Sequence, residues 1–232
     1  YKNPRGERQK YAGMLAAMDE AIGQIVTALK DKGILDNTLI LFSSDNGGPA
    51  PGRTTDNTPL RAGKGTIYEG GIRVCAFAHW PGHIPAARIK EPLHMVDWYP
   101  TLVKLAGGSL EQKKPLDGLD IWPVLTQGAR SPHESILLCG TLPKRVALRM
   151  GDWKLLLNPS DKDAEDAKTD DAMTGKVELY NLADDIGEKK DLAAANPKKV
   201  EELRVKLSEY MKGFVPPGRG TNADPPGKSG SE

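Results

Sequence analysis

The spacing of apolar and polar positions predicts a chain that mixes helices with strands. Apolar residues recur at helical spacing over residues 7–32, which predicts a long amphipathic helix that ends at Gly33. The short apolar run at 38–42 favours a strand buried on both faces of an α/β sheet. A second strand is predicted over 71–78, so the first half of the chain is assigned to the α/β class.

The middle of the chain is predicted to be mostly irregular, with two short helices. Residues 49–64 are rich in Gly, Pro, Thr and Asn, and residues 80–92 carry three prolines, so both segments are expected to be loops. A helix is predicted over 97–106, where Asp97 can cap the first turn. A shorter helix is expected over 119–126.

The pattern changes after about residue 128, where four short β-rich segments follow one another. They are predicted to form antiparallel strands over 135–139, 146–150, 153–158 and 177–181. Gly151 and Asp152 stand between two of these strands and predict a tight hairpin turn. Residues 197–212 place apolar side chains on one helical face, so a last helix is expected to pack against this small sheet.

These segments divide the chain into three predicted parts. The α/β part covers 1–130, and the small antiparallel sheet with its helix covers 131–212. A Pro/Gly/Ser-rich tail over 213–232 is expected to be disordered. Within the second part, the apolar-poor and charged stretch at 161–176 is expected to be a solvated loop.

Composition narrows the possible partners. The chain has 232 residues, enough to bury a hydrophobic core, and 32 Lys and Arg against 31 Asp and Glu give a formal net charge of +1. No strong electrostatic field therefore favours nucleic acid or an anionic membrane. No apolar run is expected to reach the roughly 18 residues of a transmembrane helix. Residues 1–10 are polar and contain no signal peptide or initiator Met, so the chain is expected to be a piece of a longer protein.

The two cysteines do not form a disulfide framework. Cys75 and Cys139 both stand in apolar runs, IRVCAFAHW and ILLCGT. Free cysteine is among the most buried residue types, so both are expected to be buried free thiols.

The stretch LILFSSDNGG places polar residues directly after the 38–42 strand. Asp45 and Asn46 offer hard oxygen ligands of the kind that Ca²⁺ or Mg²⁺ prefers, and ligands of open α/β sheets lie beyond the carboxyl ends of strands. Asp-Asn-Gly is also common turn chemistry. Two residues cannot supply the 6–8 oxygens of a calcium site, so a metal would need ligands from elsewhere.

A second candidate lies in PLRAGKGTIYEGGIR. Lys64 stands between Gly63 and Gly65, where its ammonium group could reach a phosphate-like or sulfate-like anion, although a solvated loop lysine fits the same pattern. Glu69 and Arg73 are expected to form a structural ion pair. The four histidines show no zinc-site spacing, and the chain has no P-loop, G-x-S-x-G or G-x-G-x-x-G motif.

Several blocks, in this order, resemble the C-terminal half of a type I, formylglycine-dependent sulfatase of the arylsulfatase group and the alkaline-phosphatase-like superfamily. The likeness covers about residues 11–211, and its blocks are YAGMLAAMDEAIGQIVTALKDKG, DNTLILFSSDNGG, PLRAGKGTIYEGGIRV, WPGHI, VDWYPTLVKLAG, LDGLDIWPVL, GDWKLLL and VELYNLADDIGEKKDLA. The resemblance implies the C-terminal portion of a sulfatase α/β sheet domain followed by the small antiparallel subdomain. It also implies that Asp45 and Asn46 ligate the metal, usually Ca²⁺, and that Lys64 contacts the sulfate group.

The chain departs from the family pattern at the nucleophile. The formylglycine of sulfatases arises in a Cys/Ser-x-Pro-x-Arg motif, and neither Cys75 nor Cys139 stands in one. The nucleophile and the remaining ligands are expected upstream, so this chain alone is expected to be inactive. Two alternatives stay open: a phosphoester or phosphonate hydrolase of the same superfamily, and a non-catalytic binding module.

The resemblance also suggests partners and location. A sulfated small molecule or sulfated carbohydrate is the expected substrate, with no nucleic acid and no membrane span. The expected compartment is periplasmic, secreted or lysosomal, by similarity to the family alone.

Overall fold

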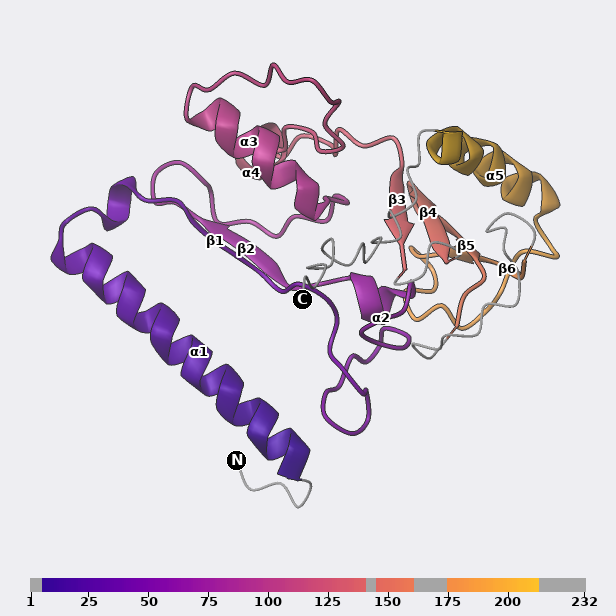
Figure 1. Ribbon diagram of the computed structural model, residues 1–232, viewed down its shortest axis with the longest axis horizontal. Coiled ribbons are helices and arrows are strands. Elements are labelled where there is room, and N and C mark those ends of the chain that lie inside the picture. Colours follow the sequence, from indigo (N-terminus) through magenta and orange to yellow (C-terminus); the bar gives the residue numbers. More distant parts are fainter. Residues whose placement is uncertain (1–5, 141–144, 161–174, 213–232) are drawn as a thin grey trace, which may run out of the picture.

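The computed structural model describes residues 6–140, 145–160 and 175–212 (Figure 1). Its α-helices are α1 (Gly6–Asp31), α2 (Glu69–Ile72), α3 (Trp98–Leu105), α4 (Trp122–Gln127) and α5 (Pro197–Lys212). Its 3-10 turns are η1 (Leu35–Asn37) and η2 (Met95–Asp97). Its strands are β1 (Ile40–Ser43), β2 (Ala76–His79), β3 (Ile136–Cys139), β4 (Val146–Met150), β5 (Trp153–Leu157) and β6 (Val177–Asn181). The loop expected over 161–176 lies almost entirely outside these residues, and the tail over 213–232 lies wholly outside them.

Strands β1 and β2 form a two-stranded antiparallel ribbon, with Ile40 opposite His79 and Ser43 opposite Ala76. The rings of Phe42 and Phe77 stack across it, with centroids 5.3 Å apart. The strand expected at 38–42 is present but half-buried rather than buried on both faces. The strand expected over 71–78 begins only at Ala76, because α2 occupies the start of that segment.

Helix α1 is the long helix that the apolar spacing predicted, but its apolar stripe is exposed. Met14 is 66% exposed and Ile25 is 61% exposed. By length and composition alone, α1 could cross a membrane, which corrects the expectation that no segment is long and apolar enough. The core helix of a soluble protein meets the same test, and Asp19 and Glu20 lie midway along α1, so membrane insertion does not follow.

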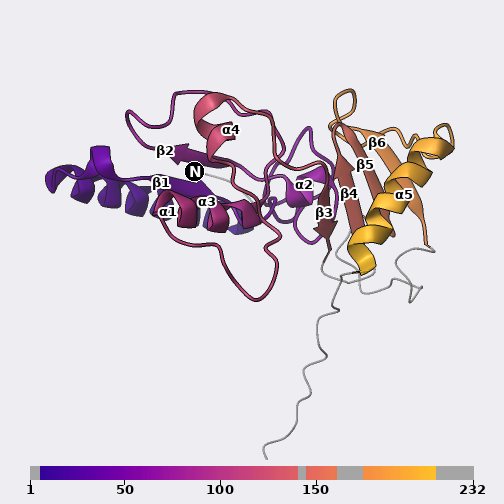
Figure 2. The same ribbon diagram turned by 90° about the horizontal axis from the view of Figure 1, so that it is seen from above.

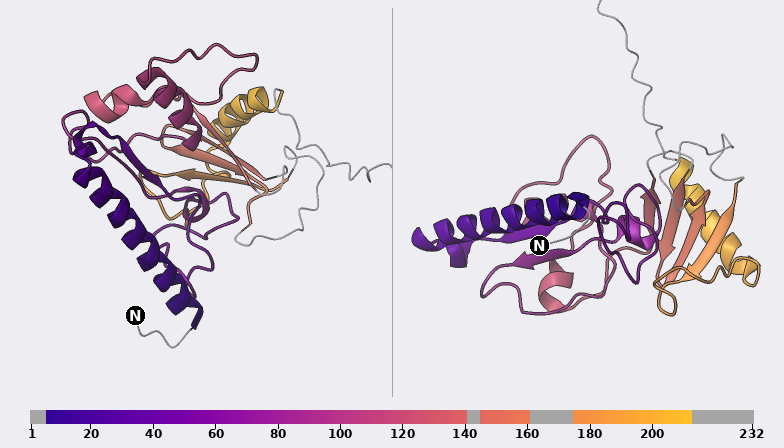
Figure 3. Two further views of the ribbon diagram at one scale, coloured as in Figure 1. Left: turned by 60° about the vertical axis from the view of Figure 1, so that its left-hand side comes forward. Right: turned by 90° about the horizontal axis from the view of Figure 1, so that it is seen from below.

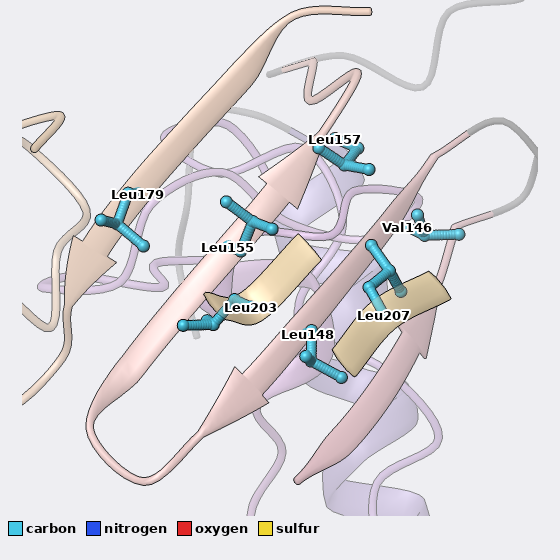
Figure 4. Close-up of a cluster of buried hydrophobic side chains, with 7 residues drawn as sticks. All are labelled: Val146, Leu148, Leu155, Leu157, Leu179, Leu203 and Leu207. Carbon is cyan, nitrogen blue, oxygen red and sulfur yellow. The ribbon is translucent and has the colours of Figure 1, made fainter. Parts of the chain in front are cut away.

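Strands β3 to β6 form a four-stranded antiparallel sheet in sequence order, as the four β-rich segments predicted. Gly151 takes a left-handed φ of 57° in the turn that joins β4 and β5. Figures 2 and 3 show α5 on the outer side of this sheet and α2 on the side toward β1 and β2. Figure 4 shows the apolar core under α5, made by Val146, Leu148, Leu155, Leu157, Leu179, Leu203 and Leu207.

The opposite face of the sheet carries a second core with polar members. Because side chains alternate along a strand, the neighbours of the α5-facing residues point the other way. There Ala147, Leu156, Tyr180 and Leu182 pack against Ile67 and Tyr68, which precede α2. This face therefore fixes the segment that contains the candidate lysine.

Asp97 and the two cysteines lie in surroundings that differ from those expected from the sequence. Asp97 does not cap α3; its buried carboxylate accepts hydrogen bonds from the backbone N–H groups of His94 at 2.7 Å and Leu119 at 2.9 Å, and it lies 2.8 Å from His133 Nε2. Asp97 thus completes a capping box with His94 at the start of η2, and ties this turn to Leu119 and His133. Cys75, which precedes β2, and Cys139, at the end of β3, are free but exposed, not buried, because apolar sequence neighbours do not decide whether a side chain is covered.

Candidate metal and anion site

The polar residues after β1 form a tight turn that leaves ligand oxygens free. The backbone N–H of Asn46 donates to Oδ1 of Asp45 at 2.9 Å, and the side-chain amide of Asn46 donates to the carbonyl of Gly47 at 3.0 Å. Within the described part of the chain, Oδ2 of Asp45 and Oδ1 of Asn46 accept no hydrogen bond. Asp45 is exposed and Asn46 is half-buried, so both oxygens can reach a ligand.

The two glycines of this turn are required by close backbone contact. A Cβ atom on Gly47 would lie 1.7 Å from the carbonyl oxygen of Gly70, and one on Gly48 would lie 2.5 Å from Oγ1 of Thr55. The N–H of Gly47 donates to the carbonyl of Gly71 at 2.8 Å. The turn therefore lies directly against α2, with no room for a side chain between them.

Lys64 lies in the loop of residues 59–66, the lysine loop. Its backbone N–H donates to the carbonyl of Gly48 at 3.3 Å. Its side chain is exposed, and no described residue accepts a hydrogen bond or ion pair from its ammonium group. Asp45, Asn46 and Lys64 all line one cavity of about 1150 Å³. The structure therefore places the three candidate residues on the lining of one cavity.

Buried charges anchor α2 to the four-stranded sheet. Lys154 Nζ lies 2.9 Å from Oε1 of Glu69 and 2.8 Å from Oε1 of Glu188, and the Lys154 side chain is 0% exposed. The backbone N–H of Glu69 donates to the other oxygen of Glu188 at 2.6 Å. Arg73 pairs with Glu69 at 3.4 Å, as expected from their spacing. In β5 three leucines follow Lys154 directly. This apolar run could have indicated a buried ion pair, because a lysine at the start of a buried run needs a buried partner of opposite charge.

The same face carries a second polar network. Glu178 accepts hydrogen bonds from the hydroxyls of Tyr68 and Tyr180, both at 2.8 Å, and from Lys176. Burial raises the pKa of Glu178, but these hydrogen bonds outweigh it and hold the pKa below its usual value. Burial, together with Glu178, raises the pKa of Tyr180 well above its usual value. Arg61 also donates to the Tyr180 hydroxyl at 2.9 Å, which links the lysine loop to β6.

The donor set fits one part of a hard-cation site. A carboxylate oxygen and an amide oxygen suit Ca²⁺ or Mg²⁺ and do not suit a thiolate-preferring metal. Residues 6–140, 145–160 and 175–212 contain no group of three or more His, Cys, Asp or Glu that could hold a metal ion. Asp45 and Asn46 therefore offer two ligands and do not complete a coordination shell.

Comparison with known proteins identifies relatives for most of the chain. A family model described as Sulfatase matches residues 1–109. The chain is 36% identical to arylsulfatase J of Mus musculus, with 90% of this chain and 41% of the relative aligned. It is 34% identical to arylsulfatase A of Homo sapiens, with 86% and 43% aligned. The chain thus spans less than half the length of these curated relatives.

Solved structures agree with these matches. The crystal structure of Ps i-CgsB in complex with k-i-k-neocarrahexaose superposes with a TM-score of 0.74 at 35% identity, over 90% of this chain and 44% of the other. The phosphonate monoester hydrolase of Agrobacterium radiobacter has a TM-score of 0.56 at 23% identity, over 87% and 39%, and shows a shared fold alone. The α/β architecture, the order of the motifs and these relatives agree: residues 1–109 are part of a sulfatase family domain, and the chain shares the alkaline-phosphatase-like fold of its sulfatase neighbours.

Proposed function

We propose that the whole protein is a sulfuric ester hydrolase, a sulfatase of the arylsulfatase group. The observation that carries this proposal is the shared cavity, which is bordered by the turn at Asp45 and Asn46 and by the exposed ammonium group of Lys64. Asp45 and Asn46 offer oxygens to a metal cation, and Lys64 offers a positive charge to an anion. A bound sulfate ester needs both, because its oxygens carry negative charge toward an incoming nucleophile.

In this proposal Asp45 and Asn46 bind a divalent cation, Ca²⁺ or Mg²⁺, and Lys64 binds the sulfate group. When bound, the cation offsets negative charge on the ester oxygens. Lys64 does the same as a compact point charge, and its flanking glycines leave the approach open. The formylglycine nucleophile is expected outside this chain, since neither cysteine stands in a Cys-x-Pro-x-Arg motif.

The test is hydrolysis of 4-nitrophenyl sulfate by the full-length protein and its variants, with metal content measured on the same samples. Asp45→Ala is expected to abolish turnover and metal retention. Lys64→Ala is expected to raise KM and lower kcat, because the lysine contacts the sulfate group throughout the reaction. Asp36→Ala and Lys32→Ala are matched controls, since both residues are exposed and lie outside the cavity. Unchanged turnover by Asp45→Ala would remove the metal assignment.

The same assay separates the two alternatives. A phosphoester or phosphonate hydrolase would turn over 4-nitrophenyl phosphate or a phosphonate monoester faster than the sulfate ester. A binding module would bind Ca²⁺ or sulfate in calorimetry but would hydrolyse none of these esters. We expect the sulfate ester to be preferred.

For the substrate class, we propose a sulfated carbohydrate or a small sulfate ester. Relatives include N-acetylgalactosamine-6-sulfatase of Homo sapiens, 37% identical over 53% of this chain. A solved neighbour, 35% identical, contains k-i-k-neocarrahexaose. A periplasmic, secreted or lysosomal location is proposed with this substrate class. Cell fractionation tests the location, and turnover of a panel of sulfated saccharides tests the substrate class.

We also propose that residues 1–130 and 131–212 are the two structural parts of the chain, with residues 213–232 as a tail.

A further inference from the structure

One side chain joins the three backbone segments of the candidate site. The side-chain amide of Asn57 donates to the carbonyl of Gly48 at 3.0 Å and to the carbonyl of Ala62 at 2.9 Å. The carbonyl of Gly70 lies farther from the same nitrogen, at 3.4 Å. The Gly48 carbonyl belongs to the turn of residues 44–48 that carries Asp45 and Asn46, the Ala62 carbonyl to the lysine loop, and the Gly70 carbonyl to α2. Asn57 is half-buried between them.

The chemistry of an amide explains this arrangement. A side-chain amide nitrogen carries two hydrogens, so it can satisfy two carbonyl groups fully, and the third contact is long for that reason. A carbonyl oxygen cannot donate a hydrogen bond, so the carbonyls of Gly48 and Ala62 can be joined only through a donor that serves both. Asn57 supplies that donor on a short stem with little rotational freedom.

The surrounding backbone leaves little space for adjustment. A Cβ atom on Gly63 would lie 2.5 Å from the carbonyl oxygen of Gly48 and 2.9 Å from Nδ2 of Asn57. One on Gly70 would lie 2.4 Å from the carbonyl oxygen of Ala62. The direct backbone hydrogen bond from Lys64 to the turn is the long one to Gly48, at 3.3 Å. The two bonds from Asn57 are shorter than this direct bond, and they add to the backbone bonds that join each segment to α2, from Gly47 to Gly71 and from Gly70 to Arg61, both at 2.8 Å.

We propose that Asn57 is a positioning residue of the sulfate-ester site, which sets the separation between the ligand oxygens of Asp45 and Asn46 and the ammonium group of Lys64. This inference rests on the proposed function. Asn57 does not line the cavity itself, and it acts through the backbone of both loops. Loss of its two hydrogen bonds would let the lysine loop move relative to the turn.

The test compares Asn57→Asp and Asn57→Ala in the full-length protein. Asp has the shape of Asn, but its carboxylate only accepts hydrogen bonds and would face two carbonyl oxygens. We expect kcat/KM for 4-nitrophenyl sulfate to fall about 100-fold, since a displacement of about 1 Å can cost that much. Ca²⁺ affinity, measured by calorimetry, is expected to fall about 10-fold or more, as for other residues that orient metal ligands.

The pH profile distinguishes positioning from general destabilisation. In Asn57→Asp, protonation of the new carboxyl group restores one O–H donor, and the neighbouring carbonyl oxygens raise the pKa of that group above the ordinary value of about 3.9. The kcat/KM of Asn57→Asp relative to wild type is therefore expected to recover as the pH falls toward about 5. Asn57→Ala has nothing to protonate, so its relative kcat/KM is expected to stay low at every pH.

Asn196→Asp is the matched control, because the Asn196 amide also donates to a backbone carbonyl, that of Leu192 at 3.0 Å, and neither residue lines the cavity. We expect it to keep wild-type kcat/KM. If Asn57→Asp does not fold, Asn57→Ala decides the question. Wild-type kcat/KM and wild-type Ca²⁺ affinity in Asn57→Ala would overturn the inference. A wild-type protein without sulfatase turnover would overturn the proposed function instead.

Discussion

Replacement of Lys154 by Met removes the one ammonium group that two buried carboxylates share. Lys154 is 0% exposed, and the side chains of its partners Glu69 and Glu188 are 3% and 0% exposed. Each N–O distance is below 3 Å, where a pair of unit charges attracts by about 6 kcal/mol at an effective dielectric constant near 20. Most of that attraction is offset by desolvation. Loss of one partner from a buried pair nevertheless costs about 3–5 kcal/mol, because the remaining charges stay buried.

The loss of stability in Lys154→Met should depend on pH in a defined direction. Burial raises the pKa of Glu188, and Lys154 opposes that rise in the wild type. Without Lys154 the folded-state pKa rises further above the unfolded value of 4.5. A raised carboxyl pKa means that the folded state binds a proton which the unfolded state does not. The penalty is therefore fully present above the folded-state pKa, and it shrinks as the pH falls toward 4.5.

Urea unfolding of wild type and Lys154→Met at pH 8 and pH 5 measures both effects. We expect a loss of about 3–5 kcal/mol at pH 8 and a smaller loss at pH 5. The triple variant Lys154→Met, Glu69→Gln, Glu188→Gln carries no buried charge at these positions, so it should regain much of the loss. A loss below about 1 kcal/mol at pH 8, or one that grows as the pH falls, would refute the assignment of a coupled buried network.

Other contacts lead to three further predictions. Gly47→Ala is expected to lower the free energy of unfolding by about 1–3 kcal/mol, because the new Cβ would meet the carbonyl of Gly70 at 1.7 Å; an unchanged melting temperature would show that this contact relaxes freely. Leu203→Ala removes a fully buried side chain and should cost about 2–5 kcal/mol in urea unfolding, whereas Val205→Ala, at a position 52% exposed, should stay within about 0.5 kcal/mol; equal losses would contradict the orientation of α5. Glu178 has a lowered pKa, so it stabilises the fold above pH 4.5, and that contribution fades as the pH falls through the folded-state pKa; Glu178→Gln should flatten this part of the stability profile, and a profile parallel to wild type would argue against the network.

The regular elements of the second half were predictable because local patterns determine them. The four β-rich segments pair in sequence order, and the turn at Gly151 has the backbone conformation that its residue type favours. Helix α5 was predicted from its apolar face, which the core under it confirms. In these segments periodicity, turn chemistry and packing agree, so the sequence pattern is sufficient.

The segment around α2 was not predictable in the same way. The residues from Gly71 onward have a strand-like composition, yet they begin with a helical turn in which the N–H of Arg73 bonds the carbonyl of Glu69. Close backbone contacts at Gly70 and Gly71 and the ion pair of Glu69 with Lys154 hold that turn. Such contacts come from distant parts of the chain and override local preference.

The residues of the candidate site were likewise predictable only in part. Asp45, Asn46 and Lys64 were recognised from their residue types and from motif order, and the structure places them on one cavity. The hydrogen bonds of Asn57 leave no comparable local signature, and the apolar run after Lys154 does not identify its two partners. An asparagine in a Gly/Pro-rich loop resembles ordinary turn chemistry until its three carbonyl neighbours are known.

The sequential strand order of the second sheet has a consequence for how the protein folds. Neighbouring strands in this sheet are also neighbours in the chain, and their longest connection is residues 158–176 between β5 and β6, so the sheet can form through comparatively local loop closures. The links that hold the candidate site span far more chain, 85 residues from Glu69 to Lys154 and 110 from Tyr68 to Glu178. We expect the sheet to assemble early and the site to be organised late. Substitutions in the sheet core should then slow refolding, whereas substitutions at Asn57 or Glu69 should mainly accelerate unfolding.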